Sequence, residues 1–364
     1  MDGLIDIPGE MLEAENVREV EEINNIHGRN YQQRINPLNK YDDKDFRSMY
    51  RINKETARFL INLVRRDIET NNSKRGLPID SEIQVLATLR YFAKGGYQND
   101  IAEIHGMSQS TLSRTIKKVV SAVARHRHEY IKFPVDQESI RTLKRDFFNI
   151  AACPSIVGAI DGTHIKIKNP GKRDLYPLTY QNRKGFFSLN VQVVCDAKCR
   201  VLDIVTRWRG SVHDSRIWHE CELKNKFERR EINGILLGDS GYPSSRYLLT
   251  PLLNPQTLPE ERYNRSHIQT RNVIERFFGI WNNKFRCFLN RLHIDLNVAK
   301  NALVALAVIH NIYMEHRDNN NDSNEEDNDD NDSICNQNQI EENQNEENCQ
   351  RNAFRQIYIN RHFQ

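Results

Sequence analysis

The pattern of apolar positions along the chain changes near residue 150. Between residues 53 and 120, apolar side chains recur every three or four positions, as in amphipathic helices that bury one face. Beyond residue 150, short continuous runs rich in Val and Ile end near Ile167 and Leu237, which is typical of buried strands. Two further runs, 187–194 and 200–208, flank a polar turn and predict an antiparallel pair. The sequence therefore predicts a helical region followed by an α/β domain.

Three acidic residues occupy special positions in this pattern. Asp161 lies in the middle of the first strand-like run, Asp239 directly follows the run that ends at Gly238, and Glu275 lies in a segment with helical spacing. Carboxylates that converge raise one another's pKa unless a cation lies between them. Two Mg²⁺ or Mn²⁺ ions roughly 3.5–4 Å apart would activate a water or a 3′-hydroxyl for in-line displacement at phosphorus. The three acids therefore predict a site for metal-assisted phosphoryl transfer.

Each acid also has an ordinary structural explanation. Asp161 would serve as a hydrogen-bonded strand acid, Asp239 as a turn former at a strand end, and Glu275 as the partner of Arg271, one helical turn away. The order of the three favours the catalytic interpretation, because a strand acid, a strand-end acid and a helix acid follow one another. In this order, 35 residues separate the second acid from the third.

The sequence around the acids is distinctive. Its key segments are GAIDGTHI at 158–165, YQNRKG at 180–185 running into SLNVQVVCD at 188–196, GSVHDS at 210–215, LGDSGYP at 237–243 and RNVIERFFG at 271–279. Over about residues 45–316 the chain resembles the PIF/Harbinger transposases and the nucleases derived from them. The resemblance implies an RNase H-like DDE catalytic domain, in which helices flank a mixed sheet. It also implies DNA as substrate, and Asp161, Asp239 and Glu275 as catalytic acids and metal ligands. It also implies Asp214 as a further ligand of the metal site.

The segment around Asp214 leaves two interpretations open. Asp214 precedes a short predicted helix, so its carboxylate would either cap that helix or take part in the metal site that the resemblance implies. His213 is expected to be a structural or substrate-facing polar residue, since no serine or cysteine nucleophile motif accompanies it. Arg209 stands where the pattern of the family leads us to expect a proline.

A helix-turn-helix is predicted over residues 98–120. Ala102, Gly106, Leu112 and Ile116 occupy the positions where this motif needs a small residue, a left-handed turn and packed apolar side chains. The second helix would present polar side chains to base edges and cations to phosphates. These candidate contacts are Gln109, Ser110, Ser113, Arg114, Lys117 and Lys118. The alternative is a helical bundle with a solvated basic face.

Cations in the catalytic region are further candidates for DNA binding. Lys166 follows the first acid on the same strand, and Arg183 and Lys184 lie in a turn before the next strand. Arg265 and Arg271 fall between the second and third acids, in a stretch that begins with a Pro-rich segment. Lys166 would equally serve to protect a sheet edge.

Composition and charge divide the chain of 364 residues further. Residues 318–350 hold 12 Asp and Glu and no Lys or Arg, so that without them the stated net charge of +3 becomes +15. A body this basic favours a polyanionic partner. The predicted parts are a flexible acidic arm (1–40), a helical domain (41–135), the catalytic domain (136–316), a disordered Asn-rich acidic segment (317–350) and a basic amphipathic end (351–364).

Other classes of protein are disfavoured. The seven cysteines are odd in number and lack Cys-x-x-Cys spacing, which argues against a zinc ribbon and a disulfide framework. The longest apolar run, 302–309, is far short of the roughly 20 residues that span a bilayer, so we expect no membrane.

These observations predict a nuclear DNA nuclease that depends on Mg²⁺ or Mn²⁺. The resemblance also implies a separate Myb/SANT-like partner protein that supplies site recognition and nuclear entry, while assembly into a homo-oligomer is left open. The alternative from another class is a domesticated DNA-binding or scaffold protein that kept the acids but lost turnover. A nuclease that prefers RNA is a third hypothesis.

Overall fold

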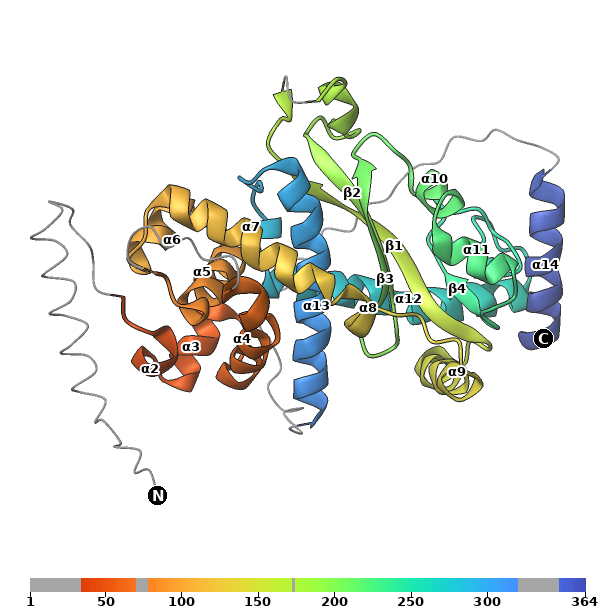
Figure 1. Cartoon of the computed structure of the whole chain (residues 1–364). Helices are drawn as coiled ribbons and strands as arrows, with labels where there is room; N and C mark the ends of the chain where they lie inside the picture. Colours follow the sequence, from red (N-terminus) through yellow and green to blue (C-terminus); the bar gives the residue numbers. More distant parts are fainter. Residues whose placement is uncertain (1–33, 70–77, 172–173, 320–346) are drawn as a thin grey trace, which may run out of the picture. The chain divides into compact units, whose positions relative to one another are not determined.

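The computed structural model describes residues 34–69, 78–171, 174–319 and 347–364, which Figure 1 colours along the sequence. The chain divides into two compact units, Met1–Val119 and Val120–Gln364. The division falls after residue 119, so residues 120–135 group with the second unit. Most of the predicted arm and of the predicted acidic segment lies outside the described residues. Among the helices of the described ranges, none is long and apolar enough to cross a membrane.

The first unit is built from helices. They are α2 (Pro37–Lys40), α3 (Asp43–Tyr50), α4 (Lys54–Glu69), α5 (Ser81–Lys94), α6 (Gln98–Ile104) and the start of α7 (Gln109–Arg125). Side chains of Asp42 and Asp80 accept hydrogen bonds from backbone N–H groups in the first turns of α3 and α5, which satisfies donors that the helices cannot. Gly95 ends α5 in the left-handed conformation, as its position in the sequence predicts. Helices α3 and α4 both pack against α5.

The second unit contains a sheet and its covering helices. Its helices are α8 (Arg127–Tyr130), α9 (Gln137–Ala151), α10 (Asp214–His219), α11 (Glu222–Glu228), α12 (Leu258–Lys284), α13 (Leu296–Asn319) and α14 (Glu347–His362), with short 3₁₀ helices η2 (Pro177–Tyr180) and η3 (Arg286–Phe288). Its strands are β1 (Ile156–Lys166), β2 (Ser188–Cys195), β3 (Val201–Arg209), β4 (Ile235–Leu237) and β5 (Leu248–Leu249).

The sheet is mixed, with strand order β3-β2-β1-β4-β5. Strands β1, β2 and β3 pair antiparallel, and β4 lies parallel to both β1 and β5. The predicted meander around the Asp196–Cys199 turn is present, since Oδ1 of Asp196 accepts from the backbone N–H groups of Lys198 and Arg200. A helical region followed by this mixed sheet is the architecture expected of an RNase H-like DDE domain, so the predicted fold class is confirmed.

Helices fix the sheet in place. Figure 1 shows α9 and α12 beside β1, and both helices pack against that strand, while α13 packs against β3. His310 on α13 is buried, and its Nε2 lies 2.8 Å from the carbonyl oxygen of Cys199. Among the described residues, Cys153, Cys195, Cys199, Cys221 and Cys287 are free and buried.

Helix α12 begins earlier than the sequence suggested. Residues 258–267, in the stretch that begins with the Pro-rich segment, form the first turns of α12. The reason is a capping box, in which the Thr257 side chain accepts from the N–H of Glu260 and the Glu260 carboxylate accepts from that of Thr257. Pro259 lies in the first turn, where its missing N–H costs nothing.

The C-terminal helix α14 packs against α12. Tyr358 and Phe363 make edge-on contacts with the buried ring of Tyr263 on α12. The hydroxyl of Tyr358 donates to the carbonyl oxygen of Pro154 at 2.6 Å, just before β1. The end of the chain therefore ties α12 to the start of the central strand.

Candidate active site

The strand register brings Asp161 and Asp239 together. Ala159 on β1 pairs with Leu237 on the parallel strand β4, and each acid lies two residues beyond this pair. Because strand side chains alternate between faces, residues two positions after a paired position share the same face and edge. Each acid accepts a local hydrogen bond, Asp161 from the N–H of Gly162 at 2.7 Å and Asp239 from the N–H of Gly241 at 3.0 Å.

Asp214 reaches the same edge from the loop after β3. It is the first residue of α10 rather than its N-cap, and its Oδ1 accepts from Nδ2 of Asn190 on β2 at 2.7 Å. The same amide group donates to the carbonyl oxygen of Val212, which fixes the loop. A Cβ at position 162 would lie 2.4 Å from Oδ1 of Asp214, so a glycine is required for this close approach. The capping interpretation of Asp214 does not describe its contacts.

Helix α12 contributes Glu275 and Arg271. Nη1 of Arg271 lies 3.2 Å from Oδ2 of Asp161, and Nη2 of Arg271 donates to Oε1 of Glu275. The Glu275 side chain is 56% exposed, whereas the Arg271 side chain is only 17% exposed. The ion pair with Arg271 that the sequence offered as an ordinary role for Glu275 is present. Arg271 extends it to Asp161, 110 residues away in the chain.

The pKa values of Asp161, Asp214 and Asp239 are all raised above the ordinary value of an aspartate. Burial raises the pKa of Asp161 to about 7, with Arg271 opposing the rise and the charges of Asp239 and Asp214 adding to it. Burial also raises the pKa of Asp239, against the opposing effect of Arg271 and with a contribution from Asp214. Burial raises the pKa of Asp214 too, and the hydrogen bond from Asn190 lowers it. Burial thus destabilises the ionised form of all three carboxylates, and the charges of neighbouring aspartates add to this effect at Asp161 and Asp239.

The residues fit a divalent cation by their chemistry. Carboxylate oxygens are the ligands that Mg²⁺ and Mn²⁺ prefer, and a cation between repelling carboxylates stabilises their ionised form. Within the described part of the chain, no group of three His, Cys, Asp or Glu side chains stands in an arrangement that could hold a metal ion. In this structure Arg271 binds Asp161 and Glu275, and Asn190 binds Asp214.

The predicted cations of the catalytic region lie in different surroundings. Arg183 donates to the ring of His213, next to Asp214, and Lys184 lowers the pKa of His164 by its charge, after the larger effect of burial. Lys166 lies over the ring of Phe186. Arg265 is exposed on α12. Arg271 was predicted to contact DNA, and in this structure its guanidinium is engaged by the acids.

In the first unit, α6, α7 and the turn between them lie where the helix-turn-helix was predicted. Gly106 has a φ of 58°, and Leu112 and Ile116 are fully buried. The predicted contact residues Gln109, Ser110, Ser113, Arg114 and Lys117 are exposed, and Lys118 is half-buried, with its pKa lowered by burial. The face that was predicted to meet DNA is therefore open to solvent in this unit.

Two supporting residues of the acid site were missed from the sequence. Asn190, which holds Asp214, lies in the SLNVQVVCD segment, and a polar residue inside an apolar strand was the available signal. Tyr242 is buried, with its hydroxyl 3.4 Å from Oε1 of Gln192, and the charges of Asp214, Asp161 and Asp239 all contribute to raising its pKa, after burial. Nothing in its sequence position separates it from an ordinary core tyrosine.

Comparison with known proteins agrees with this geometry. Residues 160–311, which contain all four acids, match a family described as DDE superfamily endonuclease. A Homo sapiens protein named "Putative nuclease HARBI1" is 33% identical over 283 residues, covering 77% of this chain and 80% of the relative. An Arabidopsis thaliana protein named "Protein ALP1-like" is 26% identical over 297 residues, covering 76% and 72%. No solved structure matches the chain.

Proposed function

Because the chain belongs to the family of Harbinger-derived nucleases with a DDE endonuclease domain, we propose that it hydrolyses DNA phosphodiester bonds with the help of divalent cations. One observation carries the proposal: Asp161, Asp214 and Asp239 lie at one edge of the sheet, where burial raises the pKa of each and neighbouring carboxylates add to the rise at Asp161 and Asp239. Burying mutually repelling carboxylates is costly unless a cation joins them in the working state. Phosphoryl transfer gives a reason for burying these carboxylates together, whereas a purely structural site would gain little from this arrangement.

Each acid has its own part in the proposed reaction. Bound Mg²⁺ or Mn²⁺ would activate a water and stabilise the charge that develops on the phosphate. Asp161 and Asp239 are the principal ligands, and Asp214, held by Asn190, assists them. Glu275 completes the set from α12. With a 3′-hydroxyl in place of water, the same site would carry out strand transfer.

Arg271 is proposed to keep the acids ready for a cation. Its charge lowers the pKa of Asp161 and of Asp239, so it favours the ionised forms that bind metal. If Asp161 and Glu275 held a divalent cation, its charge would repel the Arg271 guanidinium that pairs with both acids. Arg271 would then be free to contact a phosphate, as the sequence suggested.

DNA is the proposed substrate, supported by the positive charge of the chain outside residues 318–350. Arg183, Lys184 and Lys166 are proposed to contact the phosphates of the cleaved strand, and Arg265 those further along α12. The exposed face of α7 would add contacts to DNA of its own. We further propose a nuclear location and a Myb/SANT-like partner that selects the target, since the helix-turn-helix alone offers few side chains for base recognition.

A second function is favoured by one observation. Arg271 balances the charge of Asp161 and Glu275, as it would in a domesticated DNA-binding or scaffold protein that no longer cleaves. Such a protein would bind DNA through the same cations and leave it intact.

Nicking of supercoiled plasmid by the purified full chain tests the proposal. We expect open-circular product with Mg²⁺ or Mn²⁺, and none with EDTA or in the Asp239→Asn variant. The Asp146→Asn variant is the control, because Asp146 pairs with Arg145 on α9, away from the acids. Plasmid binding without nicking, also after addition of a Myb/SANT-like partner, would favour the scaffold. Faster cleavage of RNA than of DNA would overturn the substrate class.

A further inference from the structure

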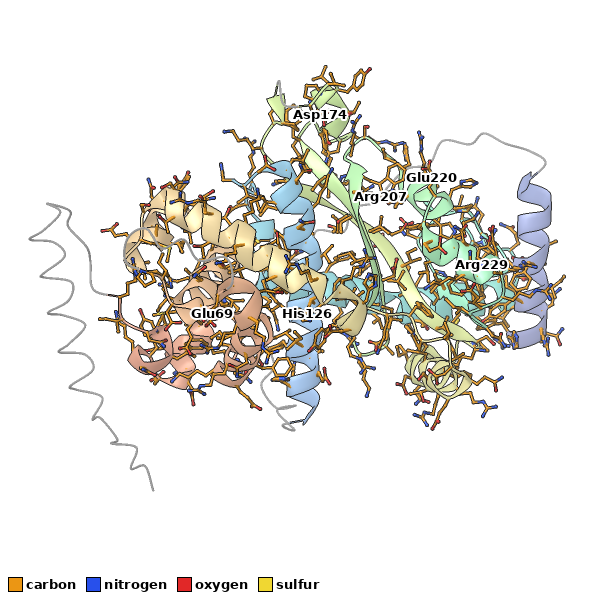
Figure 2. The ribbon with its side chains drawn as sticks, in the orientation of Figure 1. Glu69, His126, Asp174, Arg207, Glu220 and Arg229 are labelled. Carbon is orange, nitrogen blue, oxygen red and sulfur yellow. The ribbon has the colours of Figure 1, made fainter. Side chains whose placement is uncertain are left out.

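The loop between β1 and β2 exposes three large apolar side chains. Leu175 is 90% exposed, Tyr176 64% and Leu178 73%, all within four residues. We call these three residues the apolar tip. Single exposed apolar residues are common on protein surfaces, but a contiguous group marks a site of interaction. Figure 2 shows this loop, with Asp174 labelled, in the upper part of the view.

The exposure of the apolar tip is maintained by a polar framework. Oδ1 of Asp174 accepts from the backbone N–H of Tyr176 at 2.9 Å, and its Oδ2 accepts from the hydroxyl of Tyr180 at 3.0 Å. Arg209 forms an ion pair with Asp174 and lies over the rings of Tyr176 and Tyr180. The loop therefore has a defined conformation that holds its apolar side chains in water, where a collapsed loop would have hidden them.

The same framework connects the apolar tip to the acid site. The carbonyl oxygen of Thr179 accepts from the N–H of Ser211, three residues before Asp214. Gly210 allows this approach, because a Cβ there would lie 2.5 Å from the carbonyl oxygen of Tyr180. Asn190 then joins the loop to Asp214 through its bonds to Val212 and to the carboxylate. A group held by the apolar tip would thus keep a fixed position relative to the acids.

Positive charges surround the apolar tip. Arg209 and Lys300 both lower the pKa of Asp174 by their charge, after the larger effect of its hydrogen bonds. Arg183 and Lys184 lie in the turn that follows, which Gln181 braces by donating to the carbonyl oxygen of Gly185 at 3.0 Å. Cations around an apolar group suit a polyanion that also offers flat apolar faces. A second copy of this chain would bring like charges together.

We propose that the apolar tip inserts between base pairs of DNA bound at the acid site, while the surrounding cations hold the adjacent phosphates. Apolar side chains that enter a base step unstack it and bend the duplex, and aromatic rings stack on bases of any sequence. An opened step gives the carboxylates access to a phosphate that a regular duplex would hold further away. This inference rests on the proposed function, since it takes DNA as the substrate.

Unwinding of relaxed plasmid by the full chain tests the inference without cleavage. A eukaryotic type I topoisomerase, active in EDTA, relaxes the plasmid in the presence of the protein, and the linking number is measured after the protein is removed. We expect the wild-type chain to lower the linking number in proportion to the protein bound. The triple variant Leu175→Ser/Tyr176→Ser/Leu178→Ser is expected to bind plasmid with similar affinity but to produce a shift at least about fivefold smaller.

The double variant Leu253→Ser/Leu289→Ser is the control, because both leucines are more than half exposed and lie outside the apolar tip. It should unwind plasmid like the wild type. A triple variant that binds and unwinds plasmid normally would overturn the inference. A triple variant that differs from the wild type only in a smaller mass measured by light scattering would also overturn it, because the apolar tip would then form a contact between copies of the chain. A wild-type chain that nicks plasmid but never unwinds it would overturn the inference alone. Failure to bind plasmid would overturn both it and the proposed function.

Discussion

Nη1 of Arg271 lies 3.2 Å from Oδ2 of Asp161, and this contact joins the acid on the central strand to the helix that carries the last acid. The guanidinium is the largest influence that opposes the burial of the carboxyl group. In the absence of metal, it holds the pKa of Asp161 down to about 7. The ability of Asp161 to act as a ligand near neutral pH therefore depends on Arg271.

Replacing Arg271 should shift the pH dependence of cleavage. In Arg271→Ala the pKa of Asp161 rises further, so the acid limb of the nicking rate should move to higher pH. Arg271→Lys keeps a positive charge and should give a smaller displacement. Arg145→Ala on α9 is the matched control and should leave the limb in place. An unchanged limb in Arg271→Ala would show that Asp161 does not control the rate.

The buried carboxyl of Asp161 should make stability depend on pH. Its folded pKa of about 7 lies above the ordinary value of 3.8, so the folded state holds a proton that the unfolded state loses, and stability falls as pH rises through this window. In EDTA, Asp161→Asn should therefore raise the free energy of unfolding, relative to wild type, by about 2–4 kcal/mol more at pH 8 than at pH 4. Denaturant unfolding at the two pH values measures this difference, and an equal effect at both would contradict it.

Replacing Gly162 by alanine should harm the protein, whereas replacing Gly279 by alanine should stabilise it. Gly162→Ala places a Cβ 2.4 Å from Oδ1 of Asp214, so nicking should fall by at least about tenfold even where the variant remains folded. Gly279→Ala on α12 meets nothing within 4 Å and should stabilise the chain by about 0.5–1 kcal/mol without loss of activity. Thermal unfolding and nicking of both variants provide the comparison. Normal nicking by Gly162→Ala would remove Asp214 from the site.

The exposed face of α7 should contribute measurably to DNA affinity. Arg114→Ala/Lys117→Ala removes two exposed cations, which should weaken plasmid binding and reduce the salt dependence of log K by about 2. Lys44→Ala/Arg58→Ala removes the same charge from exposed positions elsewhere in the first unit. Equal losses in the two double variants would favour a helical bundle with a solvated basic face over a DNA-reading helix.

The C-terminal helix should stabilise the second unit through one hydroxyl group. Tyr358→Phe removes the donor to the carbonyl oxygen of Pro154 and should lower the free energy of unfolding by about 1 kcal/mol. Ile357→Ser, at a 64% exposed neighbouring position, should change it far less. Chemical denaturation of both variants measures the effect. A neutral Tyr358→Phe would mean that α14 is held by its apolar contacts alone.

Much of the fold was predictable because local patterns and tertiary packing agree. The strand runs, the Asp196–Cys199 turn and the left-handed Gly106 follow from periodicity and turn chemistry alone. The start of α12 was not predicted, because the prolines between residues 251 and 259 suggested a loop and the Thr257/Glu260 capping box was overlooked. Helix ends depend on single side chains more than on the average pattern.

The sequence predicted which residues form the acid site, but it did not predict the contacts that these residues make. Sequence spacing alone suggests that Arg271 pairs with Glu275, four residues later, but the bond to Asp161 depends on how α12 packs against β1. The apolar tip was hidden for another reason. Its residues lie in a loop that is polar on average, and their exposure depends on the conformation that the hydrogen bonds of Asp174 give to this loop.

Mn²⁺ binding by the full chain, followed by the loss of the free-ion signal in electron paramagnetic resonance, tests the central claim most directly. At pH 8 the wild-type chain should bind up to about two Mn²⁺ ions more than the Asp161→Asn/Asp239→Asn variant. The acidic residues of 318–350 are identical in the two chains, so weak binding there cancels in the difference. Asp146→Asn should bind Mn²⁺ like the wild type. Equal binding by the wild type and the double variant would contradict a metal site built on these acids.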